Sequence, residues 1–220
     1  ISRVCKYRPF PSVKREVIND LFHFSSGNYI ARIFEGLPAL ILPIMVVNML
    51  GAEANAYFFI AWVMSGVLSR MPSIATSQSL LAEGSYKREE LRRNIKRAGK
   101  FISLILILAM IIILLFGRHI LWIFGEKYAR NSFEILLILM LGCIPFAFNT
   151  LYASVKRVQK EIIPLIWIYG SITVIILTAS YFLMRSIGII GVGIAWVLGN
   201  GIASLGIAVT NHQSLRILLK

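Results

Sequence analysis

The chain has 220 residues, of which 57% are hydrophobic and only 15% are charged, and its mean hydropathy is +0.75. Soluble domains carry roughly 45–50% apolar and about 25% charged residues, so this composition excludes an ordinary water-soluble globule. The net charge of +13 could indicate nucleic-acid binding, but the lysines and arginines stand between long apolar runs, as in the loops of membrane proteins. We therefore expect a multi-pass membrane protein whose surroundings are the lipid bilayer and whose partners do not include nucleic acid.

The apolar runs predict an all-α membrane protein with a bundle of six transmembrane helices. A hydrocarbon core of ~30 Å is crossed by about 20 helical residues, and none of the runs has the alternating pattern of a membrane β-barrel. The third run is short unless residues 117–122 extend it, and the basic segment 83–100 before it is predicted to form an amphipathic helix that continues towards it. The expected spans are residues 29–50, 54–81, 101–116, 133–154, 162–183 and 188–209.

The distribution of positive charge predicts the orientation of the helices. Seventeen lysines and arginines lie before the first span, in the second-to-third and fourth-to-fifth connections and after the last span, against four in the other connections. By the positive-inside rule, residues 1–27 form a basic cytoplasmic leader or inter-lobe connector and residues 211–220 form a cytoplasmic tail. The six-helix lobe, residues 28–210, is then expected in the cytoplasmic membrane with both of its ends on the cytoplasmic side.

Three charged residues inside the expected spans are the candidate functional residues. A charge at mid-membrane costs at least ~2.5 kcal/mol on insertion scales, so one that persists usually faces protein or a water-filled cavity. Arg32 and Glu35 lie three residues apart on one helical face, where they can neutralise each other, and Arg70 lies deep in the second span. Two structural alternatives stay open: Arg32 and Glu35 form an interfacial ion pair, or Arg70 extends to the cytoplasmic headgroups.

Prolines interrupt the spans that carry these charges. A proline inside a helix removes a backbone donor and frees a carbonyl group, which a hydrated cavity can satisfy. Proline-interrupted spans with polar residues are typical of a transport pathway. Residues 66, 70, 73 and 77 form a polar stripe at helical spacing around one of these prolines. The positions assigned to a cavity or a hinge are Pro38, Pro43, Pro72, Ser73 and Ser77.

Other polar and small residues in the spans are interpreted mainly as packing devices. Small residues at every fourth position of the last span form a smooth ridge on which a second helix can approach closely. This ridge consists of Gly191, Ala195, Gly199 and Ala203. Asparagines within spans, such as Asn149 and Asn200, are more often interhelical hydrogen-bonding residues than ligands.

The residues of common enzyme sites are missing from the sequence. It contains no GxxxxGK[ST] phosphate loop, and its three histidines lack the spacing of metal ligands. The outer face of the expected bundle offers Glu53, Glu126 and Glu134, which are not paired as a glycan transferase would need. We therefore predict no catalytic residue, no metal and no cofactor, and a transporter rather than an enzyme. A membrane-embedded glycan transferase or polymerase and a non-transporting scaffold remain the alternatives of another class.

Several segments in order resemble one family of transporters. The order and spacing of these segments are similar to the C-terminal half of prokaryotic oligosaccharide flippases. This family is also called the polysaccharide biosynthesis proteins and belongs to the multidrug/oligosaccharidyl-lipid/polysaccharide exporter superfamily. The segments are residues 24–30, 37–38, 42–43, 50–52, 56–58, 81–85, 124–129, 156–160 and 191–196.

The resemblance implies two six-helix lobes around a cavity and an alternating-access movement that flips lipid-pyrophosphate-linked glycans. Because the chain begins at Ile1 and has one lobe, we expect a truncated or excised half whose missing N-terminal lobe is its partner. Under this resemblance Arg70 and Arg32 would line the cavity and bind the pyrophosphate, and Glu35 would couple transport to a proton or cation. A drug or organic-cation antiporter of the same superfamily is the closest alternative, although two arginines against one carboxylate favour an anionic cargo.

Overall fold

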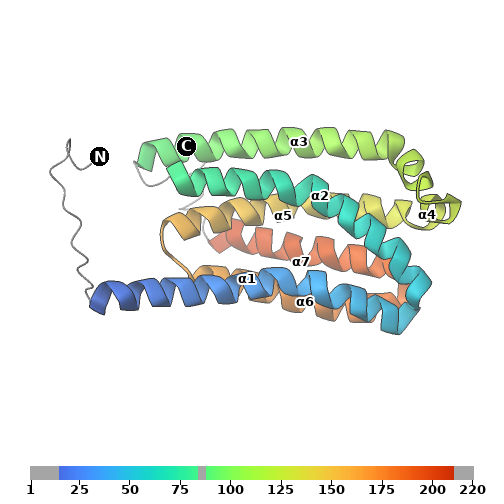
Figure 1. Cartoon of the computed structure of the whole chain (residues 1–220), viewed down its shortest axis with the longest axis horizontal. Coiled ribbons are helices and arrows are strands. Elements are labelled where there is room, and N and C mark those ends of the chain that lie inside the picture. The colour runs from blue at the N-terminus through green and yellow to red at the C-terminus, as the bar shows by residue number, and fades with distance from the viewer. Residues whose placement is uncertain (1–14, 84–87, 211–220) are drawn as a thin grey trace, which may run out of the picture.

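The computed structural model describes the backbone of residues 15–83 and 88–210, and the side chains of Ile18 and of residues 21–68 and 96–210. The described part of the chain is helical and contains no β-strand, which confirms the predicted all-α fold. Six long helices form the bundle, and one short helix lies between the third and the fourth of them in the chain (Figure 1). The helices are α1 (Arg15–Leu50), α2 (Ala52–Glu83), α3 (Arg88–Trp122), α4 (Glu126–Asn131), α5 (Phe133–Val158), α6 (Ile163–Ile187) and α7 (Ile189–Thr210).

Five of the described helices are long and apolar enough to cross a membrane: α1, α3, α5, α6 and α7. A shorter apolar stretch, Ala52–Leu68, lies in α2, which continues as one helix to Glu83. Helix α3 extends through Trp122 and begins at Arg88, so the expected amphipathic segment and the third span form one helix. Its lipid-facing side carries exposed apolar residues such as Leu104, Leu108 and Leu115, which suit a hydrocarbon surrounding better than water.

The ends of the helices define two ends of the bundle. The basic end carries the start of α1, the end of α2, the start of α3 and the turn between α5 and α6. At the opposite end Gly51, with φ of 92°, joins α1 to α2, and α4 bridges α3 and α5 (Figure 1). The short helix α4 was not expected from the sequence, because six residues between two long apolar runs are too few to show a helical period.

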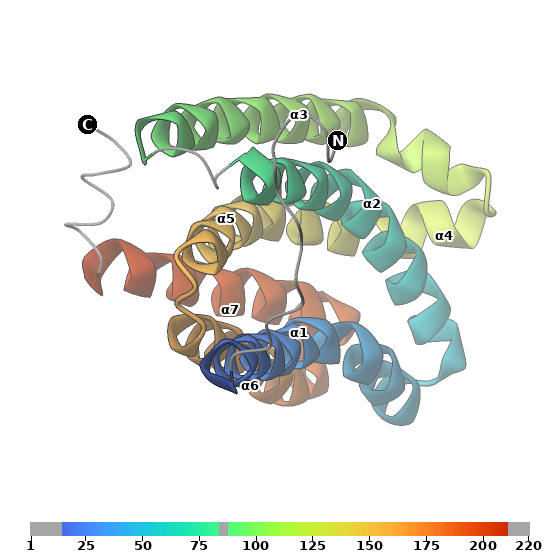
Figure 2. The same ribbon diagram turned by 60° about the vertical axis from the view of Figure 1, so that its left-hand side comes forward.

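Helices α5 and α7 occupy the middle of the bundle (Figure 2). Helix α5 packs against α2, α3 and α7, while α6 packs against α7 and α1. Trp196 of α7 meets Trp62 of α2 edge to face at 4.8 Å between ring centroids, and Phe146 of α5 lies 5.7 Å from the same indole. A Cβ atom at Gly142 of α5 would collide with this indole. Trp196 therefore packs against α5 only because residue 142 has no side chain.

The small residues of α7 pack against α6 as the sequence predicts. A Cβ atom at Gly191 would stand 2.6 Å from the backbone carbon of Leu183, and one at Gly199 would overlap Ile176. Both contacts are shorter than side chains tolerate, so the two backbones approach each other only because these positions are glycine. The ridge is therefore a packing surface, as expected.

Candidate functional site

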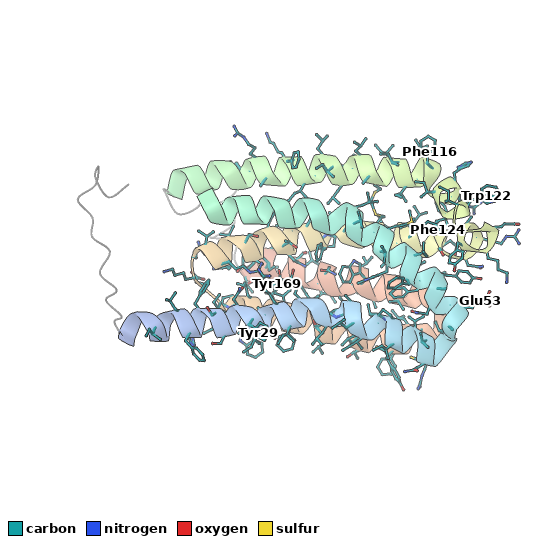
Figure 3. All side chains as sticks on the ribbon, in the orientation of Figure 1. Tyr29, Glu53, Phe116, Trp122, Phe124 and Tyr169 are labelled. Carbon is teal, nitrogen blue, oxygen red and sulfur yellow. The ribbon has the colours of Figure 1, made fainter. Side chains whose placement is uncertain are left out.

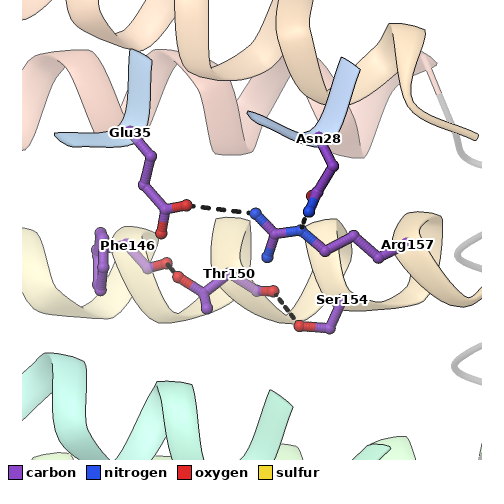
Figure 4. A network of polar contacts seen from close by, with 6 residues as sticks. All are labelled: Asn28, Glu35, Phe146, Thr150, Ser154 and Arg157. Atoms are coloured by element: carbon purple, nitrogen blue, oxygen red, sulfur yellow. Dashed lines mark hydrogen bonds and ion pairs between the residues drawn. The ribbon is translucent and has the colours of Figure 1, made fainter. Parts of the chain in front are cut away.

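A polar cluster joins α1, α5 and α6 near the basic end of the bundle. Arg157, in the last turn of α5, donates from Nε to Asn28 Oδ1 at 3.2 Å and from Nη2 to Glu35 Oε2 at 3.3 Å. Figure 4 shows the guanidinium between the two acceptors, which both come from α1. The side chain of Arg157 is only 10% exposed and that of Glu35 is 29% exposed. The pair is thus an ion pair removed from most of the surface.

The geometry of α1 explains why these residues meet. Asn28 and Glu35 are seven residues apart, which is two helical turns, so both point to the same side. Arg32 stands between them on that face, but it is exposed and forms no ion pair with any residue whose side chain the structure describes. The expected neutralisation of Glu35 by Arg32 is therefore wrong. The Glu35 carboxylate forms its ion pair with Arg157 of α5, because the Arg157 guanidinium approaches from the buried side.

The aromatic ring of Tyr169 in α6 completes the cluster. The ring centroid lies 5.8 Å from Arg157 Cζ, and Figure 3 shows Tyr169 inside the bundle next to α1. Tyr169 is 3% exposed, and its hydroxyl has no hydrogen-bond partner among the described residues. Arg157 and Glu35 neutralise each other, and the exposed Arg32 on the same face of α1 adds a second arginine, so the Arg32–Glu35–Arg157 group carries a surplus positive charge.

Sequence reasoning missed Arg157, Asn28 and Tyr169. Arg157 belongs to a run of basic residues after the fourth span, where a cation is ordinary, and it was counted there as a loop residue. A signal for Asn28 was present, because an amide two turns before an intramembrane carboxylate marks a polar helix face. Nothing local shows that this face meets α5, since 122 residues separate Glu35 from Arg157.

The backbone carbonyl that Pro38 of α1 leaves without a donor has a hydrogen-bond partner on another helix. Pro38 cannot donate the hydrogen bond that the Phe34 carbonyl would normally accept. Thr173 Oγ1 of α6 donates to that carbonyl at 2.6 Å. The carbonyl that Pro38 frees is thus satisfied by protein and not by the hydrated cavity that was expected. Pro38 is buried, Pro43 is partly buried, and α1 continues as a helix through both.

The side chains of Arg70, Pro72, Ser73 and Ser77 lie outside the described residues. The positions of Arg32 and Arg70 along their helices can nevertheless be compared, because α1 and α2 meet at Gly51. Each arginine is nineteen residues from that turn. At ~1.5 Å per residue this is about 29 Å along each helix, close to the full thickness of a ~30 Å hydrocarbon core. Both positions therefore lie about equally far along their helices from the Gly51 turn, towards the basic end.

The asparagines of α5 and α7 form a buried hydrogen-bonded cluster. Asn149 Nδ2 donates to the Asn200 carbonyl at 3.0 Å, and Asn200 Nδ2 donates to the Trp196 carbonyl at 3.0 Å. Ser204 Oγ lies 2.8 Å from Asn149 Oδ1. On α5, Thr150 and Ser154 donate to carbonyls of their own helix, as Figure 4 shows. The bond between Asn149 and Asn200 joins α5 to α7, which confirms the interpretation of these two asparagines as interhelical hydrogen-bonding residues.

At the opposite end Glu53 ties α2 to α4. Tyr57 Oη donates to Glu53 Oε1 at 2.6 Å, and Lys127 Nζ lies 3.4 Å from the same oxygen. The hydrogen bond from Tyr57 and then the nearby Lys127 ammonium hold the pKa of the Glu53 carboxyl, which precedes the second expected span, below its ordinary value. No group of three potential metal ligands occurs among the described residues. Glu53 therefore links α2 to α4 through its contact with Lys127.

A cavity of about 1000 Å³ opens at the basic end between the first turns of α1 and the turn that leads from α5 to α6. Its walls include Phe22, His23 and Ser26 of α1, together with Lys160 and Glu161 of the turn. Glu161, which is half exposed, forms an ion pair with the buried ammonium of Lys156 at 2.6 Å. This cavity lies along the same part of α1 as Asn28, so the polar cluster and the cavity share one end of the bundle.

Comparison with known proteins finds one similar curated sequence. The chain is 27% identical over 183 residues to a Shigella flexneri protein named "Putative O-antigen transporter", a match that covers 80% of this chain and 43% of the relative. No protein-family model matches the chain. The name of the relative describes a transporter and not an enzyme.

Solved structures show the same fold. A MATE protein in the straight conformation superposes with a TM-score of 0.80 at 17% identity, covering 99% of this chain and 52% of that one. An inward-facing multidrug resistance MATE transporter of the MOP superfamily gives a TM-score of 0.73 at 18% identity, covering 94% and 50%. The chain thus spans about half the length of the transporters that it matches, and its bundle has the fold of half of such a protein.

Proposed function

We propose that this chain, a half-length segment of a MOP-superfamily transporter, forms one lobe of a flippase for lipid-linked oligosaccharide or polysaccharide precursors. The partner is a second six-helix lobe in the same polypeptide. The name of the Shigella flexneri relative supports a glycan-related cargo. The observation that carries the proposal is the surplus positive charge of the Arg32–Glu35–Arg157 group at the basic end of the bundle.

The cargo is bound through its pyrophosphate group. Arginine presents a planar fork of donors that matches phosphate oxygens and forms stronger hydrogen bonds than neutral groups do. Arg32 is exposed on α1, and Arg70 stands at the same distance from the Gly51 turn on α2. In this proposal the two arginines face the cavity between the lobes, and the proline-bearing stretches around Pro43 and Pro72 act as hinges when the lobes move.

Glu35 is proposed as the coupling group. Its carboxylate holds Arg157, and the groups that surround the pair are Asn28, Arg32 and Tyr169. A proton on Glu35 would remove the negative charge, so the Arg157 guanidinium would become available to a phosphate. Binding of a proton and binding of the anionic cargo would then favour each other.

The proposed location is the cytoplasmic membrane, with the basic end of the bundle in the cytoplasm. The positive-inside rule supports this orientation. It also places Arg32, Arg70 and Arg157 near the leaflet in which a newly made lipid-linked precursor carries its pyrophosphate. A drug or organic-cation antiporter is the second candidate, because the solved MATE structures have the same fold. A cationic drug would need an available carboxylate, whereas Glu35 is already paired with Arg157.

The test is glycan export by the full-length protein with Arg32 or Arg70 replaced by alanine. Loss of a charged hydrogen bond to the cargo, worth about 1.5–3 kcal/mol, should reduce export roughly ten- to hundredfold at equal membrane abundance. Arg185→Ala is the matched control, because this exposed arginine lies at the opposite end of the bundle. Undiminished export by both Arg32→Ala and Arg70→Ala would remove the arginines from the mechanism.

The coupling role of Glu35 is tested separately with Glu35→Gln. This variant keeps the size of the side chain and removes the charge that a proton or cation would neutralise. We expect export that no longer responds to the proton or cation gradient, measured in vesicles with and without the gradient. An unchanged dependence on the gradient would assign coupling to another residue.

A further inference from the structure

An apolar groove runs along the outside of the bundle between α3 and α5. Its volume is about 420 Å³, within the range of ordinary ligand pockets. Ile102, Leu106 and Ala147 form its buried floor, while Ser103, Ile107 and Ile144 form exposed rims. The groove is therefore concave and open to the side.

The groove has the length and position of one lipid leaflet. On α3 it extends from Gly99 to Met110, which at ~1.5 Å per residue is about 16 Å. Half of a ~30 Å hydrocarbon core is about 15 Å. On α5 it extends from Ile144, near the middle of that helix, to Leu151, which is nearer to the basic end. An extended acyl chain that enters from the basic end would therefore fit along its length.

A cationic segment stands at the basic end of this groove. Lys96 and Lys100 are both exposed, and each lies three residues before a lining residue, Gly99 or Ser103, on the same side of α3. The sequence of residues 88–100 contains six lysines and arginines against two glutamates. An apolar slot below such a segment matches a molecule with an anionic head and a hydrocarbon tail.

We infer that the α3–α5 groove is a binding site for an anionic phospholipid. The headgroup phosphate lies against Lys96 and Lys100, and one acyl chain lies on Ile102, Leu106 and Ala147. The bound lipid would fill the space between α3 and α5. This inference needs only a membrane-embedded bundle and does not depend on the cargo proposed above.

The experiment compares retention of phosphatidylglycerol and phosphatidylcholine by the full-length protein. The protein is reconstituted into vesicles of both lipids, extracted in mild detergent and washed, and the lipid that remains is quantified by mass spectrometry. The variants Lys96→Gln and Lys100→Gln should each lower retention of phosphatidylglycerol about fivefold. Arg97→Gln is the matched control, because it removes the same charge from an exposed position on the opposite side of α3 and should leave retention unchanged.

A second pair of variants tests the slot for the acyl chain. A Cβ atom at Gly99 meets only Leu151 Cδ1 at 3.8 Å, so Gly99→Leu projects into the groove without a backbone clash. It should reduce retention severalfold, whereas Gly206→Leu, in open space on α7, should not. Equal retention of the two lipids, or equal effects of the lysine variants and Arg97→Gln, would overturn the inference. Displacement of phosphatidylglycerol by undecaprenyl phosphate would also overturn it, by assigning the groove to an isoprenoid chain.

Discussion

At the scale of single residues, the buried ion pair between α1 and α5 depends on where each guanidinium lies. Arg157 is inside the bundle and holds both Asn28 and Glu35, whereas Arg32 is exposed on the same face of α1. A partly buried carboxylate that loses its partner carries an uncompensated charge, which costs far more than the loss of a surface ion pair. Replacement of Arg157 should therefore destabilise the protein far more than replacement of Arg32.

We expect Arg157→Ala to destabilise the protein by about 2 kcal/mol, less than the 3–5 kcal/mol of a fully buried pair because Glu35 is 29% exposed. Arg32→Ala should change stability by no more than about 0.5 kcal/mol. Thermal unfolding of the detergent-solubilised protein measures both values. Glu35→Ala in the Arg157→Ala background should restore part of the lost stability, since no unpaired charge remains. A double variant less stable than Arg157→Ala alone would show that the pair is not the source of the effect.

The hydrogen bond from Thr173 to the Phe34 carbonyl gives a second prediction at this scale. Thr173→Val removes the donor and leaves a buried carbonyl unsatisfied, which should cost about 1–3 kcal/mol. Pro38→Ala restores the backbone N–H that the carbonyl normally receives. Thr173→Val should therefore cost less in the Pro38→Ala background, and a double-mutant cycle on thermal stability measures the difference. Equal costs in the two backgrounds would contradict this account of Pro38.

At the scale of helices, close approach of α6 and α7 depends on which glycines of α7 face α6. Gly191 stands against the backbone of Leu183, whereas a Cβ atom at Gly201 of the same helix has no atom within 4 Å. Small residues drive helix association in membranes by letting backbones come together. The two glycines thus differ in what a methyl group would meet, although both are inside α7.

We expect Gly191→Ala to destabilise the protein by about 1–3 kcal/mol, because the new methyl group overlaps α6. Gly201→Ala should be neutral or stabilising by up to about 1 kcal/mol, since alanine has the higher helix propensity and meets nothing. Thermal unfolding of the two variants in detergent distinguishes the outcomes. Equal effects of the two substitutions would show that helix propensity, and not packing, controls this interface.

At the scale of the whole molecule, the bundle has two chemically different ends. The basic end holds the Arg157 cluster, the cavity at the start of α1 and the cationic start of α3. Glu53, Trp122 and Phe124 lie at the opposite end, as Figure 3 shows. The side chains of Trp122 and Phe124 are exposed. Exposed aromatic residues such as Trp167 also lie towards the basic end, and together they fit the aromatic belts of the two membrane interfaces. The excess of lysine and arginine at the basic end is what the proposed orientation in the cytoplasmic membrane rests on.

The orientation predicts which side of intact cells reacts with a membrane-impermeant thiol reagent. In a full-length protein in which Cys5 is replaced by serine, a cysteine at Lys127 should be labelled from outside. One at Lys160 should be labelled only after the cells are opened. Both positions are exposed, and the native Cys143 is buried, so it should not contribute. Labelling of residue 160 in intact cells, with residue 127 protected, would reverse the orientation.

The sequence by itself determined the fold class, the run of apolar helices and the packing role of the α7 glycines. These properties are local, because hydropathy over about 20 residues and spacing along one helix already contain them. Only the tertiary structure decided that Glu35 pairs with Arg157 rather than Arg32, and that Thr173 satisfies the carbonyl freed by Pro38. These partners are 122 and 139 residues apart in the chain, and which faces of two distant helices meet depends on the packing of all the helices between them.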